Sequence, residues 1–383
     1  MICAYCSYDK LNIDMTDEHV LPRKLGGNLS PQNPFLIKNV CKNCNVASGR
    51  YIDGPFIRSW FMQNRRAENA KKYLDLNANP IVPLIYMGEI KNSFIREKNC
   101  DMWLGPTGDT IYHFHDPYPE QDGNQKNIGP PLYLRTDDID PGFAFIFVMA
   151  TNPAWHKCIL FSFVEQFENS ILYLGNGPTP EGGRFSEIPA ELLDLHKELK
   201  SKAGQFHQLQ FSINIDFGHR FLAKMALGCG VLFIEPQFIK SVDASKLRSF
   251  MWERNPQNRA NIQVFGTTFL NEELKPLQQL LGWDAGHIIL ILPINNKLLL
   301  TLILYGEHSA TIEICSELNL WKEKINENGI IFVIAPGFRK YVGPISFQEY
   351  IAVKTNLISI SHPLKDLFND INSIGSLPPY DLH

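Results

Sequence analysis

The sequence lacks any long apolar run, and this absence excludes a helical membrane protein. No hydrophobic stretch approaches the roughly 18 to 20 residues that a membrane-spanning helix requires. The opening residues, MICAYCSYDK, have neither the basic nor the apolar region of a secretory signal. Internal repeats and low-complexity segments are also missing. We therefore expect a cytoplasmic protein with no membrane partner.

The composition of the chain is that of an ordinary globular protein. The 383 residues are 44% hydrophobic and 20% charged, and 25 Phe and 13 Tyr supply large side chains for a core. A chain of this length exceeds what one small core usually holds, so two domains are favoured. Strand-like apolar segments interrupted by a few helical ones predict the α+β fold class.

The net charge of -4 hides an uneven distribution of charge along the chain. Residues 1–72 hold 11 Lys and Arg against 6 Asp and Glu, a balance of +5, which leaves -9 for the rest. A basic small segment joined to an acidic large one is typical of a module that faces nucleic acid beside a separate second domain. Chance variation over a short segment is the alternative explanation.

Four of the eight cysteines form two tight pairs near the start of the chain. Cys3 and Cys6 make one C-x2-C pair, and Cys41 and Cys44 make the other. Two such pairs complete a closed tetrahedral site of the structural Zn2+ type, which leaves no open position for a substrate. A redox dithiol or a disulfide is the alternative. We expect a zinc ion that stabilises the fold and takes no part in chemistry.

The segment between the two pairs carries a dense set of motifs. It contains Glu-His-Val-Leu-Pro at 18–22 and Leu-Gly-Gly-Asn at 25–28, and the second pair continues directly into Asn45. In this order, over about residues 1–55, the sequence resembles the HNH endonucleases, in particular the zinc-framed subgroup whose first motif begins with Glu-His. The resemblance implies a ββα-metal fold and hydrolysis of DNA phosphodiester bonds with a catalytic Mg2+ or Mn2+ ion.

Phosphodiester hydrolysis requires a base to deprotonate water and a divalent metal ion to neutralise negative charge. His19 is the only histidine in the first 100 residues, and an imidazole with an unperturbed pKa of about 6.5 can accept a proton near neutral pH. The resemblance implies that His19 is the general base at the end of a short strand. It also implies that Glu18 holds the catalytic ion, with Asn45 as a second ligand or a water-mediated partner.

The middle Asn of the motif has several candidates. Many members of the family carry an Asn nine residues before the last motif residue, and that position is Leu36 here. Asn33 lies twelve residues before Asn45, a spacing that resembles the Glu-His subgroup better, and Asn39 is a third candidate. We favour Asn33 as the residue that fixes the loop carrying His19.

One acid and several basic residues extend the candidate site. Asp53, eight residues beyond Asn45, is either an additional metal ligand or an exposed acid. A helix is expected over residues 55–74, with basic side chains on one face that could lie along phosphates or simply face solvent. The candidates for contacts with nucleic acid are Arg23, Lys24, Arg58, Arg65 and Lys72.

The rest of the sequence predicts secondary structure but no catalytic or binding site. We expect a small nuclease module with structural zinc at 1–75, a loop-rich linker at 76–131 and a larger mixed α+β domain at 132–383. Strands are expected at 143–149, 158–164 and 208–215, and a hairpin of 288–294 and 298–304 around Asn295-Asn296. Helices are expected at 189–202 and 219–232.

The resulting hypothesis is a metal-dependent endonuclease that cuts DNA. The C-terminal domain would recognise the substrate, dock a protein partner or bind an activating small molecule, and so gate a nuclease module that folds by itself. Such a layout is similar to that of bacterial antiviral defence effectors, which is an analogy of layout alone. The alternative is a zinc-ribbon protein that binds nucleic acid without cleaving it.

Overall fold

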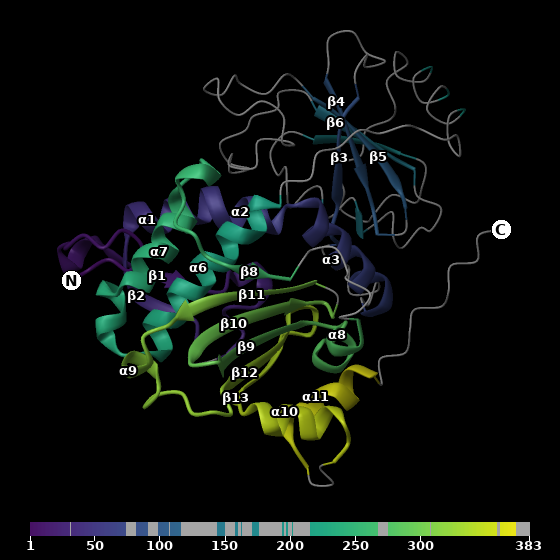
Figure 1. The fold of residues 1–383 in the computed structure, drawn as a ribbon. Helices are drawn as coiled ribbons and strands as arrows, with labels where there is room; N and C mark the ends of the chain where they lie inside the picture. Colours follow the sequence, from purple (N-terminus) through teal and green to yellow (C-terminus); the bar gives the residue numbers. More distant parts are fainter. Residues whose placement is uncertain are drawn as a thin grey trace. The chain divides into compact units, whose positions relative to one another are not determined.

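The computed structural model describes the N-terminal and C-terminal parts of the chain and separate stretches between them (Figure 1). The described residues are 1–30, 32–73, 82–90, 99–106, 108–115, 144–149, 158–159, 162, 171–175, 194, 197, 201, 215–266, 275–306, 308–357 and 361–372. Within them, no helix is both long and apolar enough to cross a membrane.

The chain forms two compact units, and neither is continuous in sequence. The first unit combines Met1–Ile57 with Asn214–Gly375, and the second combines Arg58–Ile213 with Ser376–His383. These units do not follow the expected division at 1–75, 76–131 and 132–383, because the N-terminal segment shares its unit with the C-terminal part of the chain. Both units mix helices and sheets, which confirms the α+β class.

The N-terminal segment forms a hairpin followed by a helix. Strands β1 (Met15–His19) and β2 (Leu36–Cys41) pair antiparallel, with short 3-10 turns η1 (Asn12–Asp14) and η2 (Arg23–Leu25) on either side of β1. The chain then continues without a break through α1 (Lys42–Ser48), the π-helical turn η3 (Gly49–Asp53) and α2 (Gly54–Ile57). This arrangement puts Glu18 and His19 at the end of β1, as the resemblance implied.

A six-stranded antiparallel sheet forms the centre of the first unit, in the order β13-β12-β9-β10-β11-β8. Its strands are β8 (Val264–Phe265), β9 (His287–Ile294), β10 (Lys297–Leu304), β11 (His308–Cys315), β12 (Ile330–Ala335) and β13 (Lys340–Ile345). The expected hairpin is present as β9 and β10, and Asn295 and Asn296 both adopt the positive φ that a tight hairpin turn requires.

Helices α6 (Asp216–Phe233) and α7 (Val242–Trp252) pack against each other and against β11, and α6 also contacts β2 (Figure 1). The sequence predicted α6 from its apolar stripe, but eleven consecutive residues from Arg220 to Gly230 are buried, so the whole circumference of the helix is covered.

The other helices described in the first unit are η6 (Pro236–Lys240), η7 (Pro256–Asn258), α8 (Lys275–Leu281), α9 (Leu318–Trp321), η9 (Pro336–Phe338), α10 (Phe347–Lys354) and α11 (Pro363–Asn372).

The N-terminal segment packs aromatic side chains against the rest of the first unit. The rings of Phe35 and Phe332 meet edge to face with centroids 4.8 Å apart, and those of Phe56 and Phe221 stack at 4.0 Å. A segment of fewer than 60 residues buries a smaller share of its surface than a larger domain does, and here α6 and β12 contribute part of the apolar surface that it packs against. That residues 1–75 form a nuclease module that folds by itself stays a prediction.

The second unit holds a helix and a five-stranded sheet. The strands are β3 (Ile85–Glu89), β4 (Asn99–Leu104), β5 (Thr110–His115), β6 (Ala144–Met149) and β7 (Ile171–Gly175), ordered as numbered, and only the β6–β7 pair is parallel. Helix α3 (Trp60–Tyr73) packs on β3 through Ala67, Ile85, Met87 and Met102.

Two sequence expectations change over residues 55–213, and two more lie mostly outside the described residues. The helix expected over 55–74 is interrupted at Arg58 and Ser59, so that α2 and α3 are separate. The strand expected at 158–164 is wrong, since Cys158, Ile159 and Ser162 are helical. The strand at 208–215 lies outside the described residues except for its last position, and the helix at 189–202 is described only at three helical residues.

The contact between α6 and the end of β1 generates a stability prediction. A Cβ atom added to Gly228 would lie 2.4 and 2.6 Å from the two methyl carbons of Val20, closer than real contacts allow. We expect Gly228→Ala to lower the free energy of unfolding by about 1–3 kcal/mol through overpacking, measured by denaturant unfolding of the full chain.

Gly49→Ala is the matched control, because a Cβ there meets nothing within 4 Å and the backbone is right-handed helical. This control should be neutral or stabilising by up to about 1 kcal/mol. Equal stability of the two variants would contradict the packing of α6 against Val20.

Candidate active site

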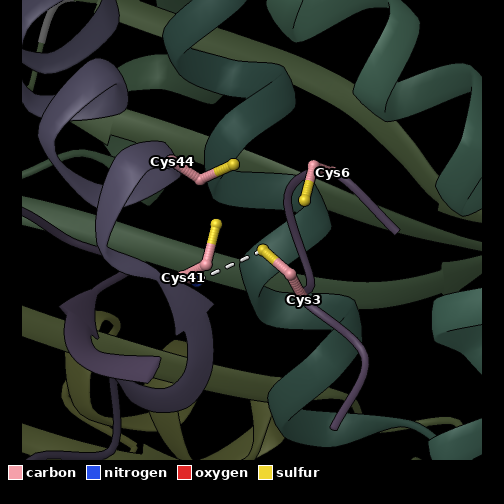
Figure 2. A group of neighbouring side chains, drawn as sticks. All are labelled: Cys3, Cys6, Cys41 and Cys44. Atoms are coloured by element: carbon pink, nitrogen blue, oxygen red, sulfur yellow. Dashed lines mark hydrogen bonds between the residues drawn. The ribbon is translucent and has the colours of Figure 1, made fainter. Parts of the chain in front are cut away.

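The four paired cysteines come together as a cluster, as Figure 2 shows. Cys3 and Cys6 lie in the N-terminal loop, Cys41 ends β2 and Cys44 lies in α1, and their sulfur atoms are all within 4.8 Å of one another. Tetrahedral zinc with Zn–S bonds of about 2.3 Å would hold its sulfurs about 3.8 Å apart, so a small contraction suffices. Among the described residues, no other group of three or more metal-binding side chains was found.

One sulfur of this cluster, that of Cys3, is stabilised as a thiolate by its neighbours. A hydrogen bond from the Cys44 thiol lowers the pKa of Cys3 to about 4, and the backbone N–H of Cys41 also donates to the Cys3 sulfur at 3.3 Å. The same interaction raises the pKa of Cys44 far above its usual range, because its proton is held between the two sulfurs. A Zn2+ ion replaces that proton and stabilises all four thiolates, so the four-cysteine cluster fits zinc.

The first cysteine pair is held in place by α7. Arg248 donates from Nε to the carbonyl oxygen of Ala4 at 2.7 Å, and Trp252 donates from Nε1 to the carbonyl oxygen of Tyr5 at 2.8 Å. Both carbonyls lie between Cys3 and Cys6 in the chain. The geometry of the knuckle therefore depends on side chains about 245 residues away.

His19 lies at the end of β1, partly exposed and held on both ring nitrogens. The exposed side chain of Arg23 donates from Nε to Nε2 of His19 at 2.9 Å. The side-chain amide of Asn33 lies 3.2 Å from Nδ1. Asn33 adopts a positive φ of 37°, which Asn tolerates better than most residues, in the turn that leads into β2. The structure thus brings together three of the residues singled out from the sequence.

The electrostatic surroundings of His19 favour its neutral form. Partial burial lowers the pKa of His19 below its usual 6.5, and the positive charge of Arg23 lowers it further. The negative charge of Glu18 acts in the opposite direction without reversing the shift. A neutral imidazole at pH 7 is the form that can accept a proton.

Glu18 and Asp53 are brought together by a residue from α6. Lys224 is completely buried, and its Nζ lies 2.8 Å from Glu18 Oε1 and 3.0 Å from Asp53 Oδ2. The Tyr5 hydroxyl also donates to Glu18 Oε1, at 3.1 Å. Burial raises the pKa of Asp53 to about 6 against the attraction of Lys224, while the two carboxylates raise the pKa of Lys224 in spite of its burial.

Asn45 anchors α1 to the strand that carries Glu18 and His19. Its amide nitrogen donates to Thr16 Oγ1 and to the carbonyl oxygen of Asp17, each at 2.9 Å. Because the nitrogen is used in this way, Oδ1 is the atom with which Asn45 would contact a metal ion.

The basic candidates divide between the two units. Arg23 and Lys24 belong to the first unit. Both are exposed, and they follow His19 closely in the sequence. Arg58, Arg65 and Lys72 belong to the second unit, where Arg65 is half-buried and Lys72 is exposed. The pKa of Arg58 is lowered by burial, so this residue is poorly placed for a solvated phosphate contact.

Sequence reasoning missed Lys224 and Tyr5. Lys224 lies 205 residues from His19, and its only signal is a charged residue inside the apolar run Phe-Leu-Ala-Lys-Met-Ala-Leu of α6. Such a position is normally buried, and a buried lysine needs partners. The acids that supply them could not be identified without the fold.

Comparison with known families agrees with this geometry. Residues 3–61 match the family model described as HNH endonuclease, which confirms the resemblance of the N-terminal segment. The matched segment contains both cysteine pairs, β1, β2 and α1. A nuclease domain of this kind implies a nucleic acid substrate. Searches of curated proteins and of solved structures found no match for this chain.

The cysteine cluster predicts one zinc ion per chain. Cys41→Ser should lose that zinc and the cooperative unfolding of the first unit, since structural zinc contributes on the order of 10 kcal/mol of apparent binding energy in small zinc domains. Elemental analysis and thermal unfolding measure the two effects. Cys229→Ser, at a buried cysteine of α6 outside the cluster, should keep its zinc. Folded, zinc-free wild type would contradict the assignment.

The Arg23–His19 contact predicts a shift in the titration of His19. Because the positive charge of Arg23 opposes protonation, Arg23→Met should raise the pKa of His19 towards its unperturbed value. An NMR titration of the imidazole, assigned with His19→Gln, measures this directly. Lys24→Met removes the same charge from the next residue and should shift the pKa less. A fall in the pKa of His19 on loss of Arg23 would contradict the contact.

Proposed function

We propose that this protein is a metal-dependent endonuclease that hydrolyses phosphodiester bonds in DNA, with His19 as the general base. The observation that carries this proposal is the placement of His19, which lies at the end of β1 between Arg23 and Asn33 inside the segment that matches HNH endonucleases. The zinc cluster provides the frame on which this site is built.

Asn33 serves to orient the base. Arg23 Nε can only donate, so Nε2 of a neutral His19 accepts and the ring proton sits on Nδ1, next to Asn33. The amide of Asn33 can supply an acceptor there through its oxygen, since the two ends of an amide exchange by a half rotation. In the described structure Asn33 Oδ1 is buried with no hydrogen-bond partner, which favours that rotation. This contact supports Asn33 as the middle residue of the motif.

Arg23 serves to bind a phosphate of the substrate. Its guanidinium is exposed and carries further N–H donors beyond the one directed at His19. If the guanidinium turns towards that phosphate, its Nε leaves Nε2 of His19, which then becomes available to a water molecule. Arg23 therefore links substrate binding to exposure of the base.

Glu18 and Asn45 are the residues that would hold the catalytic Mg2+ or Mn2+ ion. Glu18 uses Oε1 for Tyr5 and Lys224, and Asn45 uses its nitrogen for β1, so Glu18 Oε2 and Asn45 Oδ1 remain as hard oxygen donors. Mg2+ commonly binds through one or two protein oxygens together with waters and phosphate, so this small donor set fits it. When bound, such an ion neutralises charge on the phosphate and leaving oxygen.

Asp53 and the C-terminal part of the chain have structural roles in this proposal. Asp53 binds Lys224 through Oδ2, while its Oδ1 is buried and has no hydrogen-bond partner. A role in bacterial defence, or gating by a ligand or partner, rests on analogy of layout, and no contact of the described residues favours either. Lys24, Arg65 and Lys72 would add phosphate contacts without sequence preference.

The decisive experiment is DNA cleavage by the full chain with Mg2+ or Mn2+. His19→Ala should reduce cleavage by at least about 10^2-fold, the usual contribution of a general base, while zinc content and thermal unfolding stay close to wild type. His362→Ala, at the start of α11, is the matched control and should cleave normally. A zinc-loaded wild type that binds DNA but does not cut it would favour the zinc-ribbon alternative.

A further inference from the structure

Lys224 makes an unusual set of contacts at the end of β1. Its Nζ donates to the backbone carbonyl oxygens of His19 at 2.8 Å and Val20 at 3.1 Å, in addition to the carboxylates of Glu18 and Asp53. The side chain itself is completely buried. One ammonium group therefore joins four oxygens, three of which belong to the residues of the Glu-His motif and its neighbour.

This ammonium has no capacity left for a substrate. A lysine ammonium carries three N–H donors, and four acceptors already lie between 2.8 and 3.1 Å from it. Because the group is also buried, a phosphate could not reach it. Lys224 is consequently not a catalytic residue, and its effect on chemistry can only pass through the groups that it holds.

The two carbonyl contacts fix the backbone of His19. In an extended strand, successive carbonyl oxygens point in opposite directions, yet those of His19 and Val20 both approach the same nitrogen. The chain must therefore turn at this point, immediately after β1. The ammonium stabilises that turn by attracting both carbonyl dipoles, and the direction of the imidazole follows from it.

The carboxylate contact fixes Glu18 in the same way. Both Lys224 and Tyr5 bind Oε1, and the side chain of Glu18 is 5% exposed. Hydrogen bonds from such outer partners orient a carboxylate ligand, and their loss typically weakens metal binding by about 10–100-fold. Stability alone does not account for a lysine here, since buried ion pairs are often no more stabilising than apolar residues of similar size.

We propose that Lys224 is a positioning residue that aligns the base His19 and the metal ligand Glu18 from α6. This inference rests on the proposed function and deepens it, because it makes the geometry of the nuclease site depend on a residue far outside the segment that matches the family. Asp53 balances part of the charge of the ammonium and holds it in place.

Lys224→Met, a neutral side chain of similar length, tests the proposal in the full, zinc-loaded chain. Mn2+ binding, followed by electron paramagnetic resonance in the absence of DNA, should weaken by at least about 10-fold, while zinc stays at one equivalent. The kcat for DNA cleavage should fall at saturating Mn2+, because His19 is also misaligned. Lys354→Met is the matched control, since Lys354 is a half-buried lysine that donates to the Gly282 carbonyl at 2.7 Å, away from β1.

A second variant covers the case in which the first does not fold. Lys224→Met combined with Asp53→Asn removes one charge of each sign and leaves the net charge of the buried group of Lys224, Glu18 and Asp53 unchanged, which proteins tolerate better than the loss of one partner alone. Compared with Asp53→Asn alone, the double variant should still bind Mn2+ at least about 10-fold more weakly.

The outcomes separate the two proposals. In a folded Lys224 variant, Mn2+ binding as tight as in its reference, or tighter because a positive charge beside the site is lost, would overturn the positioning role and leave the nuclease intact. Failure of both Lys224 variants to fold, with Asp53→Asn folded, would make Lys224 a purely structural residue and also overturn it. A wild type that neither binds Mn2+ nor cleaves DNA would contradict the proposed function, and the inference with it.

Discussion

The buried ammonium of Lys224 is the interaction on which the arrangement of the first unit depends. It joins α6 to the end of β1 and to Asp53 in η3. A charge placed away from water is costly unless its partners are close and complete. This requirement makes the position of α6 specific, because a displaced helix would leave the ammonium or the carboxylates without partners.

The cysteine cluster and α7 stabilise the N-terminal loop at the other end of the hairpin. The N-terminal loop up to Asp14 contributes few buried side chains and exposes Tyr8, Leu11 and Ile13. Such a loop is too small to be stabilised by apolar burial. Metal ligation fixes it to α1 and β2, and hydrogen bonds from Arg248 and Trp252 fix it to α7.

The candidate active site therefore lies on a small motif supported by a larger scaffold. His19, Asn33 and Arg23 form its exposed part, where substrate would arrive, and Glu18, Tyr5 and Lys224 form its buried part. Precise placement of reacting groups contributes strongly to catalysis. A scaffold that fixes β1 from behind supplies that placement without occupying the exposed side of the site.

The sequence by itself determined the candidate site residues that lie close together along the chain. The cysteine spacing predicted the metal cluster, because short spacings restrict how a chain can fold on itself. The hairpin and the following helix were implied by the resemblance that the Glu-His pair and the Asn after the second cysteine pair carry. Only the tertiary structure decided that residues 1–57 and 214–375 form one unit and that Lys224 binds Glu18 and Asp53. Contacts between residues some 200 positions apart depend on how whole elements pack. Apolar packing is nondirectional. The sequence of α6 therefore did not indicate which strand the helix would contact.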